Sequence, residues 1–346
     1  MTSKITTPPI LSVVIPTFNR NEILNQVLGR LVEAGRLDID EGRVTITVLD
    51  NYSRTPVAST LDPEIAGRIQ VVRNFANIGM LGNILRCFEH CGGGYLWILG
   101  DDDLPSKNCF ETILHEISAS KDAVYFNFGE PRRVQGAKVK GIMGFLEAIK
   151  CFGHQVWLSS GIYRVGAFQP FLRFGYAYGY NQMPHTTVLV LRLQDNPQDE
   201  CVLLPIPIIE SQNLDQTGHW SQINSALAGG TWLDMPISPA VAARLAVLLK
   251  GNLQICRYLF LQFLLEAMST GQTRLYRTYF NQYYHRSFAL NCDFRLLFKI
   301  NFLRLAFLVP DLTYGVILTI GSLIRGRDNV KRLVKRRLQN SRTERL

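Results

Sequence analysis

The stretch Tyr95–Pro105, which reads YLWILGDDDLP, decides the fold, because an apolar run ends abruptly in three carboxylates. Three glycines precede the run and a proline follows the carboxylates. A short apolar run between such boundaries is typical of a strand buried on both faces of a parallel sheet. Adjacent anions repel one another, and at the carboxyl end of a central strand a divalent cation can neutralise them. The alternative is an acidic turn before a helix that Ser106 would cap.

Strands and helices alternate along the first third of the chain. Apolar runs predict strands at residues 11–16, 43–49, 69–72 and 123–128, and helical spacing predicts helices between them. This alternation predicts an α/β fold, a mostly parallel sheet with helices on both faces. The glycine signatures of a dinucleotide-binding Rossmann domain and of a P-loop are both missing after the first strand, which disfavours those two classes.

Polar loops follow one strand after another in this region. In parallel sheets such loops gather at the carboxyl edge, where the ligand crevice lies. We therefore expect these loops to form one site, and their polar residues are Thr17, Asn19, Asp50, Asn51, Asn74, Asn77 and Asp101–Asp103.

The second half of the chain is less regular. Residues 129–140 are polar and basic and read as a loop, whereas residues 155–165 read as a strand that lines the cleft. Pro184 starts a helix that carries His185 in its first turn. From about residue 238 the sequence becomes helical, so we expect a first domain over residues 8–225 and a helical C-terminal region over residues 236–346.

Charge and cysteine content restrict the class of protein. Of the net charge of +9, the segment 322–346 supplies +7, with nine Lys and Arg against two acids. Seven scattered cysteines without a C-x-x-C pair suit a reducing compartment, and the N-terminal residues do not resemble a signal peptide. The composition thus indicates a cytoplasmic protein with a basic tail.

Four segments together resemble family 2 glycosyltransferases of the GT-A fold, and most of all the bacterial surface-polysaccharide branch. The resemblance covers roughly the first 130 residues. Its four segments are SVVIPTFNR (residues 12–20), VLDNYS (48–53), residues 74–83 and GDDD (100–103).

This resemblance implies roles for the polar loop residues. Asp101 and Asp103 would be the D-x-D pair that holds Mg²⁺ or Mn²⁺, with Asp103 as the first choice for direct metal contact and Asp101 or Asp102 for ribose and water-mediated contacts. Such hard ions prefer oxygen ligands and stabilise a leaving diphosphate. Further donor-binding residues would be Thr17, Asn19, Arg20, Asp50, Asn77 and Asn83.

The catalytic base is the point at which the chain departs from the family pattern. An inverting transferase needs a group that deprotonates the acceptor hydroxyl, but the sequence has no acid between Glu147 and Asp195. His185 at a helix start is the best candidate base, with His154 second. His219 could be a third metal ligand or a diphosphate contact, although a plain loop histidine is the favoured interpretation.

The C-terminal sequence suggests contact with a membrane. Apolar residues between 330 and 338 form a stripe flanked by Lys and Arg, the pattern of a basic amphipathic helix on an anionic membrane surface. A solvated basic tail is the alternative. The most apolar window, 305–324, contains Pro310 and Asp311 and is marginal for spanning. A nucleic-acid partner is not expected, because no recognised module accompanies the charge.

Together these features predict a metal-dependent inverting glycosyltransferase at the inner face of the plasma membrane. It would move a sugar from a nucleotide-sugar donor to a hydroxyl of a lipid-linked or oligosaccharide acceptor in surface polysaccharide biosynthesis. A nucleotidyltransferase or a non-catalytic sugar-nucleotide-binding protein are the competing interpretations.

Overall fold

The computed structural model describes residues 8–131, 134–149, 157–211 and 229–255, together with residues 278, 281 and 298. The chain divides into two compact units, Met1–His219 and Trp220–Leu346. In the second unit, the described elements are the 3-10 helix η5 (Gly229–Asp234) and the helix α11 (Pro239–Ile255). Within the described residues, no helix has both the length and the apolarity needed to cross a bilayer.

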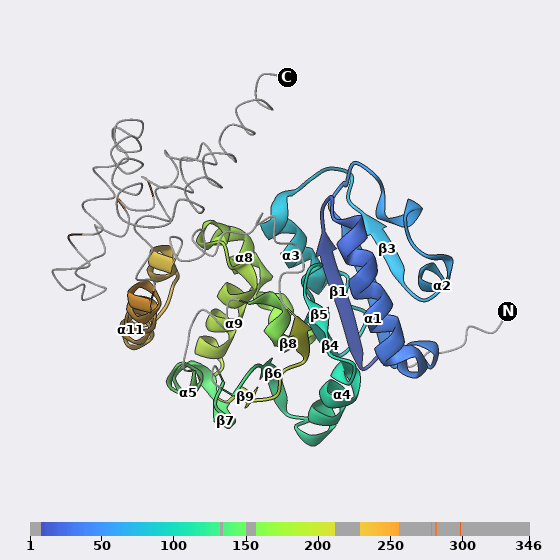
Figure 1. The fold of residues 1–346 in the computed structure, drawn as a ribbon. Coiled ribbons are helices and arrows are strands. Elements are labelled where there is room, and N and C mark those ends of the chain that lie inside the picture. The colour runs from blue at the N-terminus through green and yellow to red at the C-terminus, as the bar shows by residue number, and fades with distance from the viewer. Residues whose placement is uncertain are drawn as a thin grey trace, which may run out of the picture. The chain divides into compact units, whose positions relative to one another are not determined.

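The first unit is built on an eight-stranded sheet, with helices on both faces (Figure 1). The sheet order is β3-β2-β1-β4-β8-β6-β9-β7, and β10 pairs with β5 in a small second sheet. The strands are β1 Leu11–Thr17, β2 Val44–Asp50, β3 Gln70–Arg73, β4 Tyr95–Ile98, β5 Leu104–Pro105, β6 Ala123–Phe128, β7 Ala137–Lys140, β8 Gly161–Arg164, β9 Glu200–Leu204 and β10 Ile209–Ser211.

Helices and 3-10 turns connect these strands. The helices of the first unit are α1 Asn21–Asp40, α2 Pro63–Ala66, α3 Gly79–Glu89, α4 Cys109–Ala119, α5 Gly141–Ala148, α7 Val165–Phe168, α8 Leu172–Ala177 and α9 Pro184–Asp195. Its 3-10 turns are η1 Val57–Ser59, η2 Leu158–Ser160, η3 Gln169–Phe171 and η4 Gly179–Asn181.

The direction of the strands confirms the predicted mostly parallel sheet. Strands β3, β2, β1 and β4 are mutually parallel. Strand β8 runs antiparallel to both of its neighbours, β4 and β6, so β6 and its parallel neighbour β9 run in the same direction as β4. Strand β7 closes this side of the sheet antiparallel to β9. Six of the eight strands therefore end at one edge.

Side-chain alternation in the central strands explains why helices cover both faces. Val13 and Ile15 of β1 belong to the same buried cluster as Leu24 and Leu28 of α1 and Phe110 of α4. The intervening residues of the strands point to the opposite face, where α3 contacts β1 and β4. A strand that is buried on both faces has to be apolar throughout, as the sequence of β4 is.

Three local predictions were wrong. Ser106 does not cap α4; its N–H donates to the Ile208 carbonyl, next to the β5–β10 pair, and the helix begins at Cys109. The segment predicted as one strand over residues 155–165 contains the η2 turn, and only Gly161–Arg164 is a strand. The polar stretch 129–140 ends in the edge strand β7, whose alternating half-buried and exposed residues pair with β9.

Candidate active site at the carboxyl edge of the sheet

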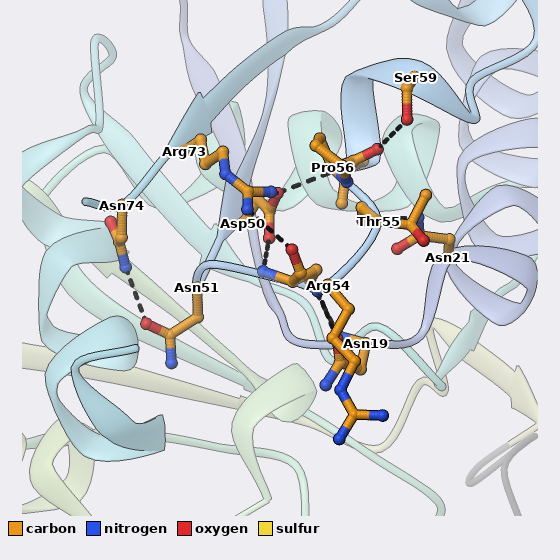
Figure 2. Close-up of polar contacts among 12 residues, drawn as sticks. Asn19, Asn21, Asp50, Asn51, Arg54, Thr55, Pro56, Ser59, Arg73 and Asn74 are labelled. Carbon is orange, nitrogen blue, oxygen red and sulfur yellow. Dashed lines mark hydrogen bonds and ion pairs between the residues drawn. The ribbon is translucent and has the colours of Figure 1, made fainter. Parts of the chain in front are cut away.

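The loop after β1 is fastened to the loop after β2. Thr17 lies opposite Asp50 in the β1–β2 register, and the Asn51 N–H donates to the Thr17 carbonyl at 2.9 Å. Asn19 has a left-handed backbone (φ 57°), its N–H donates to Ser53 Oγ at 2.9 Å, and its side-chain oxygen accepts the Arg54 N–H at 2.8 Å (Figure 2). Asn and Asp tolerate this conformation better than most residues. The two loops thus form one connected rim.

The loop after β1 also reaches the carboxylates after β4. Thr17 Oγ1 donates to Asp101 Oδ2 at 2.6 Å, and Arg20 Nη1 donates to Asp101 Oδ1 at 2.9 Å. The same guanidinium nitrogen lies 3.2 Å from Asp102 Oδ2. Burial raises the pKa of Asp101 above its usual value, and the charge of Arg20 and the Thr17 hydrogen bond only partly oppose that effect. Arg20 therefore compensates part of the negative charge at this corner.

Asp103 is held by Trp157, which directly precedes the η2 turn, and by Ser159 within that turn. Trp157 Nε1 donates to Asp103 Oδ2 at 2.8 Å, and Ser159 Oγ donates to the same oxygen at 2.6 Å. The Ser159 hydroxyl also accepts the Gly100 N–H at 2.8 Å. A Cβ on Gly100 would lie 2.9 Å from Asp103 Oδ2, so the carboxylate occupies the space that a side chain would need.

Asp50, in contrast, makes its contacts with its own loop and the neighbouring strand. It is fully buried, and its carboxylate accepts the Ser53 N–H at 2.8 Å, the Val57 N–H at 3.3 Å and Arg73 Nη1 at 2.7 Å (Figure 2). Burial alone would raise the pKa of this carboxyl, but the hydrogen bonds of Ser53 and Val57 and the charge of Arg73 outweigh it, and the pKa is lowered. The predicted donor contact of Asp50 stays a prediction, and the observed contacts stabilise the loop.

Four asparagines connect the ends of β2 and β3 to the start of α3. Asn51 Nδ2 donates to Asn77 Oδ1 at 2.8 Å, and Asn51 Oδ1 accepts Asn74 Nδ2 at 2.9 Å (Figure 2 shows Asn51 and Asn74). Asn74 Nδ2 also lies 3.0 Å from Asn83 Oδ1, and Asn83 Nδ2 donates to the Leu49 carbonyl at 3.0 Å. Asn77 and Asn83 thus belong to this amide network, and their predicted contact with a donor stays untested.

The three histidines considered from the sequence have different outcomes. His185 lies in the first turn of α9, directly after Pro184, and its side chain is buried. His154 and His219 lie outside the described residues. Among the residues that the structure describes, no group of three or more His, Cys, Asp or Glu side chains forms a protein-only metal cage. Of the site residues predicted from the sequence, the structure brings Thr17, Arg20 and Asp101–Asp103 together at the carboxyl edge of the sheet.

Sequence reasoning placed residues 155–165 on the wall of the cleft but did not connect Trp157 or Ser159 with Asp103, and it did not assign Arg73 to the site. Trp157 and Ser159 stand 54 and 56 residues after Asp103, and no spacing rule connects them with it. Arg73 could have been suspected, because it ends β3 directly beside the end of β2. In a parallel sheet a cation at that position lies near an acid that ends the neighbouring strand.

Taken together, the sheet and its polar edge define an α/β enzyme whose ligand site lies at the carboxyl ends of the strands. A family model described as glycosyl transferase family 2 matches residues 12–179, the range that contains β1–β4, the three carboxylates and the η2 turn. Residues 12–179 thus form a glycosyl transferase family 2 domain, which confirms the resemblance found in the sequence, and the chain is a glycosyl-transfer enzyme.

Individual relatives agree with this family. Abequosyltransferase RfbV of Salmonella typhimurium is 27% identical over 116 residues, which are 33% of this chain and 34% of that protein. The match therefore spans about a third of that relative's length. The crystal structure of TarS of S. aureus superposes with a TM-score of 0.56 at 13% identity and covers 88% of this chain and 53% of TarS. TarS 1–349 in complex with UDP gives a TM-score of 0.54 at 11% identity and covers 86% and 91% of the two chains. These structures share the fold.

Proposed function

We propose that the chain is an inverting, metal-dependent glycosyltransferase that takes a sugar from a nucleoside-diphosphate donor and attaches it to a hydroxyl of a saccharide acceptor. The observation that carries this proposal is the convergence of Thr17, Arg20 and the carboxylates Asp101–Asp103 at one edge of the sheet. Arg20 offers a guanidinium to the anionic diphosphate, and such charge-assisted hydrogen bonds are the stronger kind. The family match supports glycosyl transfer as the reaction class.

A divalent cation fits the residues at this edge. Mg²⁺ is usually bound by one or two carboxylates together with the phosphates of a substrate, rather than by a protein-only cage. Asp101 and Asp103, with Asp102 between them, would hold Mg²⁺ or Mn²⁺, and Asp101 in addition accepts hydrogen bonds from Thr17 and Arg20. When bound, the cation would stabilise the negative charge on the leaving diphosphate.

The nucleotide-sugar donor is supported by the structural relatives. Solved structures of TarS 1–349 contain UDP in one case and UDP-GlcNAc in another. For this chain we propose a donor of the same chemical class, with the nucleoside against the connected rim of the β1 and β2 loops. Thr17 and Asn19 would line that part of the donor, and Asn77 and Asn83 would support it through the amide network.

His185 is the proposed base. It would accept the proton of the acceptor hydroxyl as the oxygen attacks the sugar, and it lies in the first turn of α9. The buried His185 side chain has to become accessible to the acceptor, so this role implies a rearrangement when the acceptor binds. His219 is proposed as a third metal ligand from the sequence alone.

We place the acceptor in the surface-polysaccharide class and, more specifically, on a lipid carrier. The partial match to an abequosyltransferase supports polysaccharide synthesis. The basic amphipathic sequence near the C-terminus supports a peripheral position on an anionic membrane, since each Lys or Arg near such a surface is attracted to it.

Hydrolysis of nucleotide sugars in the absence of acceptor tests the central proposal. We expect the wild-type chain to release nucleoside diphosphate from one of a panel of UDP-, GDP-, CDP- and dTDP-sugars, to lose this activity in EDTA and to regain it with Mn²⁺. Undiminished turnover in EDTA would overturn the metal requirement. His185→Ala should keep donor binding and donor hydrolysis but lose transfer to an acceptor; full transfer by this variant would remove His185 as the base.

A further inference from the structure

The Asp103 carboxylate is oriented by two side chains that no sequence pattern connects with it. Trp157 Nε1 and Ser159 Oγ both donate to Oδ2, at 2.8 and 2.6 Å. Two donors on one oxygen restrict rotation of the carboxylate and so fix the direction of the other oxygen. Ser159 is fully buried and Trp157 is half-buried, so solvent competes little for these hydrogen bonds.

The η2 turn that supplies these donors is anchored to the centre of the sheet. Trp97 Nε1 of β4 donates to the Ser159 carbonyl at 2.9 Å, and Asn127 Nδ2 of β6 lies 3.1 Å from Ser160 Oγ. The turn then continues into β8, which is hydrogen-bonded on both sides. The donors to Asp103 are therefore carried by a part of the fold with little freedom to move.

The space around the carboxylate also matches this arrangement. Ser159 Oγ accepts the Gly100 N–H while it donates to Asp103, so one hydroxyl connects the end of β4 with the acid three residues later. Any side chain at Gly100 would collide with Asp103 Oδ2. The two donors, and the space left by the glycine, thus favour the observed orientation of Asp103.

We propose that Trp157 and Ser159 are positioning residues. They would preorganise Asp103 to bind the divalent cation that accompanies the nucleoside-diphosphate-sugar donor, an inference that rests on the function proposed above. Ligands of a metal ion are themselves held by hydrogen bonds, and loss of such a partner typically weakens metal affinity by about 10–100-fold. The competing explanation is that the two donors only satisfy a buried acid and stabilise the fold.

Mn²⁺ binding, measured by electron paramagnetic resonance of unbound Mn²⁺ in the presence of UDP, separates these explanations. Trp157→Phe removes the N–H and keeps an aromatic ring, and Ser159→Ala removes the hydroxyl. Each should weaken Mn²⁺ binding by roughly tenfold or more, while UDP affinity measured without metal changes less than about twofold. Ser12→Ala serves as the matched control, because Ser12 is equally buried in β1 but its hydroxyl meets Thr45.

Fluorescence gives a second readout that a purely structural role would not produce. If Mn²⁺ binds at Asp103, the paramagnetic ion lies next to the Trp157 indole and should quench its emission. The part of the quenching that comes from Trp157 should vanish in Trp157→Phe, while Trp97, Trp220 and Trp232 remain. Quenching of the same extent in this variant and in the wild type would place the cation elsewhere.

The outcomes distinguish failure of this inference from failure of the proposed function. Absence of UDP-dependent Mn²⁺ binding by the wild-type chain would overturn the metal-dependent function itself. Wild-type binding that changes less than about twofold in both Trp157→Phe and Ser159→Ala would overturn only the positioning role. An equal loss in Ser12→Ala would assign the effect to general destabilisation and would also overturn it.

Discussion

Two acids that look alike in the sequence, Asp50 and Asp103, lie in different surroundings at the same edge of the sheet. Asp50 is the last residue of β2, and Asp103 lies five residues after the end of β4. Asp50 accepts two backbone N–H groups of its own loop and the guanidinium of Arg73. Asp103 is held by an indole and a hydroxyl from a distant turn, within a run of three acids. The comparison teaches that an acid at a strand end can stabilise a loop or serve a ligand, and its partners decide which.

The largest expected difference between substitutions at Asp103 and at Asp50 is in the rate of donor hydrolysis. Asp103→Asn keeps the size of the side chain but removes the charge that a cation needs, so we expect donor hydrolysis to fall by about 10³-fold, a common cost of losing an electrostatic contact to the transition state. The unfolding transition should stay within a few degrees of wild type. Comparison of initial rates with thermal melts checks both. Retention of more than a tenth of the wild-type rate would contradict the assignment of Asp103.

Asp50→Asn should show the reverse pattern. The variant removes the carboxylate that pairs with Arg73, and loss of a buried charged hydrogen bond costs about 2–3 kcal/mol of unfolding free energy. Urea unfolding monitored by circular dichroism measures it. At a temperature where the variant is folded, we expect the affinity for UDP to remain within a few-fold of wild type.

A loss of UDP affinity larger than the loss of stability would instead support the direct donor contact predicted from the sequence. Asp122→Asn, on the exposed surface before β6, is the matched control for removal of one negative charge.

Gly100→Ala adds one carbon atom beside Asp103 and so tests whether the orientation of this carboxylate matters. The new Cβ would lie 2.9 Å from Asp103 Oδ2, so the carboxylate has to turn away from its donors. We expect roughly tenfold weaker Mn²⁺ binding with UDP, as for loss of a partner of a metal ligand. Gly92→Ala is a suitable control because a Cβ there meets no atom within 4 Å. Equal metal affinity in the two variants would mean that Asp103 does not need its observed orientation.

Much of the first unit could be predicted from the sequence, because its signals are local. Continuous apolar runs predict β1, β2, β4 and β6, and the rule that parallel strands end at one edge predicts that Thr17 and Asp101 lie close together, as they do. The left-handed backbone at Asn19 and the loop contacts of Asp50 also have local causes. Asp50 accepts the backbone N–H of Ser53, three residues further on, and such local hydrogen bonds to nearby backbone are typical of Asp side chains.

The remaining features depend on contacts between distant segments. Nothing in the composition of residues 155–165 shows that β8 inserts antiparallel between β4 and β6, and its insertion is what carries Trp157 to Asp103. The sequence predicts Ser106 as a helix cap, but its backbone N–H donates to the Ile208 carbonyl instead, and the helix begins three residues later. Tertiary contacts thus overrode local propensity at the positions where the site is assembled.

The smallest expected effect concerns the stability of the fold at low pH, to which Asp50 contributes. The pKa of Asp50 is lower in the folded chain than its ordinary value of 3.8. Asp50 therefore contributes stability that is fully present above the unfolded-state pKa and is lost as the pH falls through the lower, folded-state pKa. The difference in unfolding free energy between wild type and Asp50→Asn should be constant from pH 7 to about 5 and shrink below about pH 4, where the unfolded carboxylate binds a proton. Urea unfolding across this range measures the difference. If the difference in unfolding free energy between wild type and Asp50→Asn is unchanged at pH 3, the ionised form of Asp50 is not favoured by the hydrogen bonds of Ser53 and Val57 and the charge of Arg73.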